Sequence, residues 1–471
     1  MLFHSFLYIF AFLPTVVLGH AVLAERVGRR AAQMWLLACS LFFYWYAQPA
    51  WLPLLCGSIL LNWGAARALG AVQEKRRKAV LVAALTANIL LLCRFKYLNF
   101  LFGMLPAALR PAFPESSILP LGISFFTLTQ VMYLVDTYQG LNVPNSLFDH
   151  ATMVSLFPYV TMGPLVRSRV IVAQFQQYTL KMSRTVAASH GVFLFAIGLF
   201  KKTVFADSLA RIADAGYQTP GGLSTVEAWV TTLAYSLQIY FDFSGYSDMA
   251  VGAALMLGIE IPQNFNAPYR SKSISEFWQR WHISLSNFIT NYLYTPLLRS
   301  MGFASLKTSA LATLLAMGIA GLWHGPAWTY IIFGLLHGVG LAVNQIWKKK
   351  KLAKVPDWLG WALTFVFVNL TFVFFRSPDV RTALGVLGHL LPQGRWYDFT
   401  ALTPVLSVTP LMLFRPAVIG VVVAVWFRSS AELDKGLQLR PVTALATAAL
   451  LVAAFYSMNS APAKQFVYFA F

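Results

Sequence analysis

The sequence predicts an all-α membrane protein that crosses the bilayer many times. Hydrophobic residues make up 58% of the 471 residues and charged residues only 11%, whereas soluble domains carry about a quarter charged residues. Mean hydropathy is +0.62, and charge is absent from long runs such as residues 79–93, 186–200 and 442–458. Since a helix needs about 20 apolar residues to cross the hydrocarbon core, we expect roughly eleven to thirteen transmembrane helices, with shorter helices re-entrant or interfacial.

Positive charge follows the pattern of membrane loops. The net charge of +19 is concentrated in short clusters between apolar runs, of which Arg26–Arg30, Lys75–Lys78 and Lys348–Lys354 are the clearest. Under the positive-inside rule these clusters are cytoplasmic, which puts the N-terminus outside and makes about Leu2–Leu23 the first span. Because its basic residues follow the apolar stretch, we interpret this span as a retained helix rather than a signal peptide. No zinc-finger, basic-zipper or RNA-binding motif is present, so no nucleic-acid partner is expected.

Polar residues concentrate in the centre of the chain, which reads YFDFSGYSD from Tyr240 and, further along, ISEFWQRWHISLS. The spacing predicts one helix over Ser273–Phe288, capped by Ser273 or Ser275, with an apolar face and a polar face. A helix rich in Trp and Arg is typical of the membrane interface or of the wall of an aqueous funnel, and both interpretations remain open. The residues expected to support such a funnel are Asp242, Glu276, Arg280 and Trp281.

Three of the eight histidines, His282, His324 and His337, lie in or beside deep apolar sequence. We do not expect a metal site, because the chain has no HExxH motif and its three cysteines form no CxxC pair. At about 100° per residue, the 13 positions from His324 to His337 also put the two side chains on largely opposed faces of any one helix. Proton transfer is the other chemistry to consider, since imidazole is the commonest acid–base group near neutral pH.

The stretch GLWHGP puts His324 at a turn between two apolar runs, residues 306–323 and 328–347. Both runs have basic residues at their outer ends, so His324 should lie roughly 20 Å or more from the cytoplasmic edge. Irregular backbone at that depth requires a cavity or a close protein contact. His324 is therefore either a group for proton chemistry or a structural histidine bonded across a helix interface.

Several longer motifs carry a family resemblance. At YFDFSGYSD, NFNAPY, ISEFWQRWHISLS and GLWHG, in that order, the chain resembles the membrane-bound O-acyltransferase (MBOAT) family, and more narrowly its bacterial branch for O-acetylation of alginate, peptidoglycan and cellulose and for teichoic-acid D-alanylation. Residues 120–140 and the terminal FVYFAF are similar to the same branch. The resemblance implies one integral-membrane MBOAT domain over residues 1–471, with helices around a central funnel and a catalytic core over residues 235–338.

The resemblance also implies roles for individual residues. The catalytic histidine of the family falls on His324, as general base on an acceptor hydroxyl, and a second functional histidine falls on His282, which orients or polarises the acyl group. His337 matches the family less closely, and we interpret it as structural. Tyr468 in FVYFAF corresponds to a candidate acyl relay, although an aromatic anchor at the membrane interface has the same composition.

These expectations define a membrane O-acyltransferase, acetyl in our interpretation, for O-acetylation of an extracytoplasmic polysaccharide. The expected donor is cytoplasmic acetyl-CoA or a similar acyl thioester, with no permanently bound cofactor. The family implies a periplasmic SGNH-type acetyltransferase partner for the final transfer. We expect a multi-pass protein among the lipids of the bacterial inner membrane, with both termini periplasmic. Two alternatives stay open, a proton-coupled transporter with an intramembrane histidine relay and a non-catalytic scaffold of an export complex.

Overall fold

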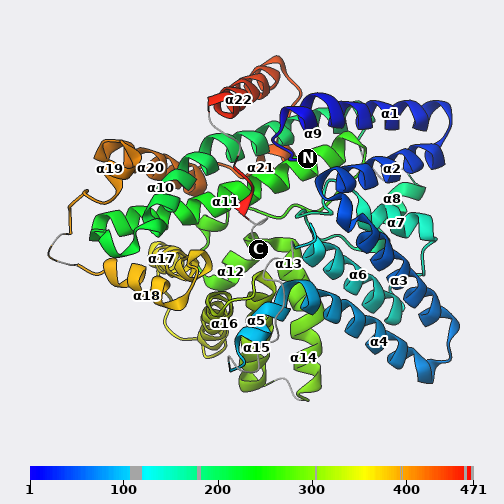
Figure 1. Cartoon of the computed structure of the whole chain (residues 1–471), viewed down its shortest axis with the longest axis horizontal. Helices are drawn as coiled ribbons and strands as arrows, with labels where there is room; N and C mark the ends of the chain where they lie inside the picture. Colours follow the sequence, from blue (N-terminus) through cyan, green and yellow to red (C-terminus); the bar gives the residue numbers. More distant parts are fainter. Residues whose placement is uncertain are drawn as a thin grey trace. The chain divides into compact units, whose positions relative to one another are not determined.

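Helices and their connecting loops make up the protein in the computed structural model (Figure 1). The structure describes residues 1–106, 119–177, 182–302, 305–392, 394, 396–460 and 464–467. No strand occurs in these residues, which confirms the all-α class expected from the composition. The described residues form two compact units. The expectation of one domain over residues 1–471 stays a prediction.

The first unit comprises residues 1–195 and 248–262. It holds the first part of α9 (Arg184–Phe200), the last turns of α11 (Thr225–Met256), and the helices α1 (Leu13–Arg26), α2 (Arg29–Ala47), α3 (Leu52–Ala71), α4 (Glu74–Leu92), α5 (Leu98–Gly103), α6 (Ile123–Tyr138), α7 (Leu147–Ser155) and α8 (Ser168–Gln176). Between α3 and α4, the amides of Asn62 and Asn88 donate to each other's oxygens at 3.2 and 2.7 Å. This reciprocal pair satisfies two polar side chains between otherwise apolar helices.

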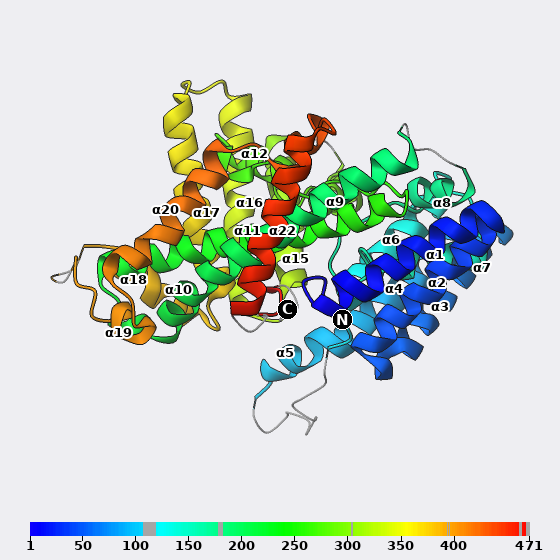
Figure 2. The ribbon, with the colours of Figure 1, turned by 90° about the horizontal axis from the view of Figure 1, so that it is seen from above.

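The second unit comprises residues 196–247 and 263–471. Its shorter helices are α10 (Asp207–Gln218), α12 (Ile274–Arg280), α13 (Ile283–Phe288), α14 (Thr295–Ser300), α18 (Val380–His389), α19 (Leu402–Leu406) and α21 (Ser430–Lys435). Its longer helices are most of α11, α15 (Leu306–His324), α16 (Trp328–Lys349), α17 (Asp357–Arg376), α20 (Pro410–Trp426) and α22 (Pro441–Ser460). α15 pairs with α16 as a hairpin, and α17 lies along the other side of α16 (Figures 1 and 2).

Seven helical segments in the described part of the chain are long and apolar enough to cross a membrane: Tyr8–Arg26, Pro49–Ala71, Glu74–Gly103, Leu306–His324, Trp328–Lys349, Asp357–Arg376 and Pro441–Ser460. This confirms a multi-pass membrane protein, with fewer such segments than the eleven to thirteen expected. α9, which contains the apolar run at 186–200, has 17 residues, and α6 has 16. α11 has 32 residues but buries acidic side chains. α9 and α6 are therefore shorter than a full span, and α11 carries buried charges that a lipid-facing span avoids.

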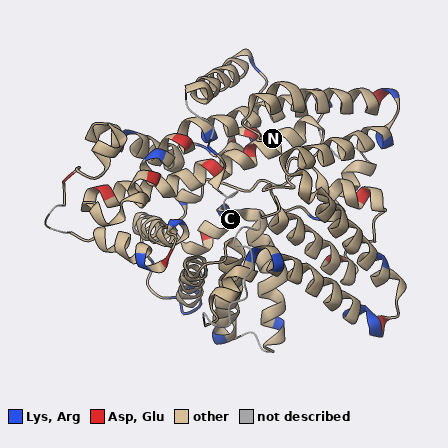
Figure 3. Cartoon of the chain, viewed as in Figure 1, with Lys and Arg blue, Asp and Glu red and all other residues tan. Residues whose placement is uncertain are grey.

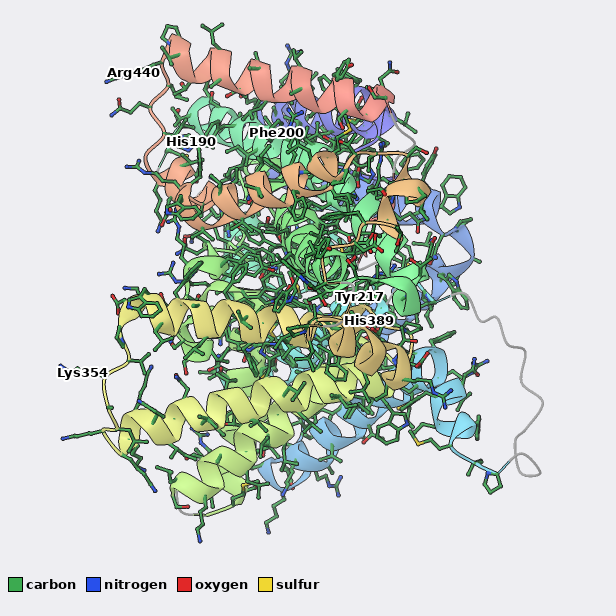
Figure 4. The ribbon with its side chains drawn as sticks, turned by 90° about the vertical axis from the view of Figure 1, so that its left-hand side faces the viewer. His190, Phe200, Tyr217, Lys354, His389 and Arg440 are labelled. Carbon is green, nitrogen blue, oxygen red and sulfur yellow. The ribbon has the colours of Figure 1, made fainter. Side chains whose placement is uncertain are left out.

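In the described residues, long stretches of helix contain no Lys, Arg, Asp or Glu, as Figure 3 shows. In the second unit, the loops that carry Lys354 and Arg440 lie at the same end of the long helices, and Tyr217 and His389 lie at the opposite end (Figure 4). Lys354 follows α16 and Arg440 precedes α22. Two basic loops at one end agree with loops on one side of a membrane under the positive-inside rule.

Candidate active site

His324 is the last residue of α15, and α16 begins at Trp328, which confirms the expected hairpin. The imidazole is buried among aromatic rings, with the centroids of Trp323 and Phe375 at 5.0 and 5.1 Å. At 1.5 Å per residue, His324 lies roughly 27 Å along α15 from Leu306. A titratable side chain therefore sits in apolar surroundings at the far end of a membrane-length helix, where burial is costly unless the group has a function or a partner.

Two glycines hold the turn that carries His324. A Cβ at Gly321 would lie 2.3 Å from the carbonyl oxygen of Tyr330, and a Cβ at Gly334 would lie 2.3 Å from the carbonyl oxygen of Met317. Both separations are far shorter than a van der Waals contact, so any side chain would force the helices apart. α15 and α16 therefore touch backbone to backbone one turn before His324, which is how small residues allow close helix packing in membranes.

The helix expected over Ser273–Phe288 is broken at His282, so the prediction of one continuous helix was wrong. α12 ends at Arg280, α13 begins at Ile283, and His282 has a left-handed backbone with φ 42°. The start was predicted correctly, because the Ser273 side chain accepts a hydrogen bond from the Glu276 N–H at 3.2 Å. The period of the apolar residues continues through the break, and for this reason the pattern alone did not reveal it.

A distant loop explains the break. The N–H of Asn266 donates to the carbonyl of Arg280 at 2.9 Å, and the N–H of Ile283 donates to the carbonyl of Asn264 at 2.9 Å. These two bonds satisfy backbone groups at the ends of α12 and α13 that an unbroken helix would pair internally. The NFNAPY motif therefore shapes the backbone around His282.

The side chain of His282 is fully buried against uncharged groups. Its Nδ1 lies 3.3 Å from Oδ1 of Asn264, and its ring packs edge-on against Phe243 with centroids 4.7 Å apart. Burial lowers the pKa of His282 to about 3, because the low-polarity surroundings disfavour the imidazolium. The imidazole is therefore neutral at physiological pH.

Aromatic rings join the neighbourhoods of the two candidate histidines, which stand 42 positions apart (324 − 282 = 42). Trp281, next to His282, packs against Phe372 with centroids 5.3 Å apart. Phe372 lies 6.1 Å from Phe375, whose ring is 5.1 Å from that of His324. The tertiary structure thus brings the FWQRWH and GLWHG motifs to opposite sides of one short cluster of rings on α17.

His337 has the structural environment that we expected. The indole N–H of Trp278 donates to its Nδ1 at 3.2 Å, and its Nε2 lies 2.9 Å from Oγ1 of Thr371. Since an indole N–H can only donate, Nδ1 is the acceptor and Nε2 carries the proton. Thr371 in turn donates to the carbonyl of Val368 at 2.9 Å. Both ring nitrogens are used within the protein, so His337 holds α12, α16 and α17 together.

The remaining candidates of α12 lie in two different settings. Arg280 and Glu276 form an ion pair at 2.9 Å, and Glu276 also accepts from the backbone N–H of Lys272 at 2.9 Å. Both side chains of this pair are part-exposed, at 29% each, so they stabilise the start and end of α12 weakly. Trp281 is buried and stacks on Phe277 with centroids 5.4 Å apart. Their expected place on a funnel wall stays a prediction.

Asp242 forms a buried charge cluster that the sequence did not predict. Its Oδ1 accepts from Nζ of Lys202 at 2.7 Å, and the same ammonium lies 2.9 Å from Oδ1 of Asp207. The side chains of Lys202 and Asp242 are 1% and 2% exposed. A buried pair of this kind offsets the cost of desolvation only through close geometry, so its presence in an apolar region calls for a specific role.

The C-terminal segment, which we define as the described residues 464–467, packs against that cluster. The backbone N–H of Val467 donates to Oδ2 of Asp242 at 2.8 Å, and Nζ of Lys202 lies 4.7 Å from the ring centre of Phe466. Phe466 is buried and packs edge-on against Tyr246 at 4.9 Å. The candidate relay Tyr468 lies outside the described residues.

Two of the cavities lined by described residues belong to the second unit. One, of about 280 Å³, is lined in part by the cluster and by the C-terminal residues Gln465–Val467, together with Asp214, Arg376 and Lys464. The other, of about 350 Å³, lies among α12, α13, α15 and α16, and none of its lining side chains is charged. Its polar lining residues are Ser275, Gln279, Ser286, Asn287, Thr290, Tyr294, Thr313 and Gln345.

Sequence reasoning missed the two residues that organise these sites, Lys202 and Asn264. Lys202 is the second residue after the apolar run at 186–200, and a lysine in that place was the available signal for a buried ion pair. Asn264 lies in the NFNAPY motif, but nothing in the sequence ties it to a histidine 18 positions later. Among the described residues, no group of three or more His, Cys, Asp or Glu side chains is arranged to hold a metal ion.

Comparison with known proteins places the chain among transferases. Residues 3–377 match the sequence profile of the membrane-bound O-acyltransferase (MBOAT) family. The chain is 36% identical to the peptidoglycan O-acetyltransferase of Helicobacter pylori, over 100% of this chain and 98% of that protein. It is 36% identical to the probable alginate O-acetylase AlgI of Pseudomonas aeruginosa, over 84% and 76%. A teichoic acid D-alanyltransferase of Streptococcus thermophilus is 29% identical over 60% of this chain and 75% of its own.

Proposed function

Because this chain belongs to the membrane-bound O-acyltransferase family, we propose that it passes an acetyl group from a cytoplasmic thioester across the inner membrane for O-acetylation of an extracytoplasmic polysaccharide. Membrane O-acyltransfer itself follows from the family and from relatives that are O-acetyltransferases. The names of those relatives, which specify peptidoglycan and alginate, support a polysaccharide as the acceptor. The transporter and scaffold alternatives are set aside, because neither accounts for this relationship.

The position of His324 carries the proposed chemistry. A neutral imidazole takes the proton of the acceptor hydroxyl while that oxygen attacks the thioester carbonyl carbon. The carbon–sulfur bond then breaks, the proton passes to the leaving thiolate, and an ester and a free thiol are formed. What supports this role is a buried titratable group in a turn at the end of a membrane-length helix, held by a glycine contact that fixes its place.

The donor in this proposal is acetyl-CoA or a similar acyl thioester, with no bound cofactor. The 350 Å³ cavity supports such a donor, because its lining combines apolar side chains with uncharged hydroxyl and amide groups. A neutral arm that carries amides and ends in a thioester matches that lining, whereas a phosphate would not. The orientation is proposed from basic loops: the loop at Arg440 before α22 puts the C-terminus on the periplasmic side, and the cluster Arg26–Arg30 after the first span puts the N-terminus there.

Tyr468 is proposed to relay the acetyl group at its phenolic oxygen to a periplasmic SGNH-type acetyltransferase, which completes the transfer to the polymer. The described residues before it support this role. Phe466 is buried, and the N–H of Val467 donates to Asp242, so the backbone just before Tyr468 is anchored to the second unit. Transfer to the tyrosine follows the same steps: the phenolic oxygen attacks the thioester carbonyl carbon, the carbon–sulfur bond breaks, and the phenolic proton passes to the thiolate.

The test is product O-acetylation in cells that carry His324→Ala, with protein amount in the membrane measured by immunoblot. Loss of a general base should lower acetylation by about 10²- to 10⁴-fold at an unchanged protein amount. His337→Gln is the matched control. It replaces a buried histidine on the neighbouring helix, and both ring nitrogens of that histidine are hydrogen-bonded within the protein. Acetylation retained in His324→Ala would refute the catalytic assignment.

A further inference from the structure

We infer that His282 accepts a hydrogen bond at Nε2 from an N–H or O–H of a substrate, and that Asn264 is the positioning residue that fixes this polarity. The inference rests on the proposed acyltransfer and changes the role expected for His282. A histidine that polarises a thioester carbonyl must donate an N–H to the carbonyl oxygen. The geometry around His282 points to the opposite polarity.

The amide of Asn264 is oriented by a backbone group. The N–H of Ser284 lies 3.1 Å from the atom assigned as Oδ1, and the Ser284 hydroxyl donates to the same oxygen at 2.8 Å. A backbone N–H can only donate, so the atom that it meets is the amide oxygen and not the amide nitrogen. The orientation of the Asn264 side chain is thereby settled without reference to His282.

That oxygen then sets the tautomer of His282. Nδ1 lies 3.3 Å from Oδ1 of Asn264, and an amide oxygen only accepts, so Nδ1 carries the proton. In a neutral imidazole the other nitrogen is the acceptor. Nε2 therefore presents a lone pair. The amide of Asn264 and the ring of Phe243 contact the imidazole, and burial rather than a charged neighbour in the described part of the chain shifts its pKa; Arg280, two positions earlier, is paired with Glu276.

Nε2 of His282 is the unused group. It is buried, and within the described part of the chain it has no hydrogen-bond partner. A buried acceptor without a donor is costly, and native proteins retain one where a ligand, a water or a reaction uses it. Two donors are available in the proposed reaction, an amide N–H of the thioester arm and the O–H of the acyl acceptor. Either one satisfies the lone pair, and the measurements below separate them.

The test is single-turnover CoA release from acetyl-CoA by the full-length protein in lipid nanodiscs, with the proposed relay Tyr468 as the acyl acceptor, measured for a matched pair of variants. His282→Gln can put an amide oxygen near the position of Nε2, whereas His282→Asn reaches only the position of Nδ1 and keeps the bond to Asn264. Asn also tolerates the left-handed backbone at this residue better than Gln does. A purely structural role therefore favours Asn, and acceptance from a substrate favours Gln.

We expect His282→Gln to lose about 2- to 10-fold in CoA release and His282→Asn to lose up to about 100-fold. A higher half-saturating concentration of acetyl-CoA would identify the thioester arm as the source of the hydrogen bond, and a lower maximal single-turnover rate at an unchanged half-saturating concentration would identify the acceptor hydroxyl. Activity of His282→Asn equal to or above that of His282→Gln would overturn the inference. If wild type releases no CoA, or His324→Ala releases it normally, the proposed function fails and this inference falls with it.

A second variant tests the polarity directly. In Asn264→Asp a carboxylate faces Nδ1–H and raises the pKa of His282, so that the ring gains a proton as pH falls and Nε2 becomes a donor. CoA release relative to wild type should then decline as pH is lowered and recover as pH is raised. Ser284→Ala is the control, because it removes one bond to Asn264 and leaves His282 untouched. Activity of Asn264→Asp that rises at low pH would show that His282 works as a donor.

Discussion

Asp242→Asn should release the C-terminal segment while the rest of the protein stays folded. The substitution removes the charge that faces Lys202 at 2.7 Å and puts an amide in its place. The amide oxygen can still accept from the N–H of Val467, but the NH2 group then faces the ammonium of Lys202. One of these two contacts must therefore be lost.

The magnitude follows from burial. Breaking a buried pair by removing one partner costs about 3–5 kcal/mol when the other charge is left alone. Lys202 keeps Asp207 as a partner at 2.9 Å. We therefore expect a smaller loss, about 2–3 kcal/mol, in the free energy that keeps the segment bound. At 1.36 kcal/mol per factor of ten, this raises the population of the open segment by about 30- to 150-fold.

The assay is the rate at which a maleimide modifies the thiol introduced by Val467→Cys, in a background without Cys39, Cys56 and Cys93. Asp214→Asn is the matched control. Asp214 also holds the segment, through Lys464 at 2.8 Å, but its side chain is 35% exposed, so solvent screens the pair and about 1 kcal/mol or less is expected. If both variants label the introduced thiol at the rate of the parent, the buried pair does not hold the segment and the reasoning is refuted.

Two further predictions concern the α15–α16 hairpin. Gly334→Ala should destabilise the purified protein by about 1–3 kcal/mol through overpacking and so lower its melting temperature. Gly318→Ala should leave the melting temperature unchanged, because its Cβ meets only the flexible end of Leu335 at 3.2 Å. Equal melting temperatures for the two variants would contradict the backbone contact. His337→Ala should cost about 1–3 kcal/mol by leaving the indole N–H of Trp278 unpaired, with unchanged CoA release per folded molecule. A lost activity at full stability would instead put His337 in the chemistry.

Much of the helical framework was predictable from local sequence. The hairpin at GLWHGP was expected between residues 306–323 and 328–347, and the helices run over Leu306–His324 and Trp328–Lys349. The cap at Ser273 was also expected, because a serine three residues before Glu276 satisfies an exposed N–H within one turn. Length, apolarity and caps act over a few residues, and for this reason a single sequence reports them well.

The partners of the buried polar groups came only from the tertiary structure. The break at His282 depends on Asn264 and Asn266, and the state of Asp242 depends on Lys202 and on the backbone of Val467. In each case the partner lies 14 or more positions away, up to 225 for Val467. The spacing of hydrophobic residues along a helix gives no information about contacts between residues so far apart in the sequence.

The sequence by itself determined the class of protein and its family, because composition and motifs are properties of the chain alone; the roles of His324, His282 and Tyr468 stay predictions. Whether His282 presents a lone pair or a proton was decided by the tertiary structure. That polarity depends on which atom of a distant amide meets Nδ1, and only folding brings that atom into place.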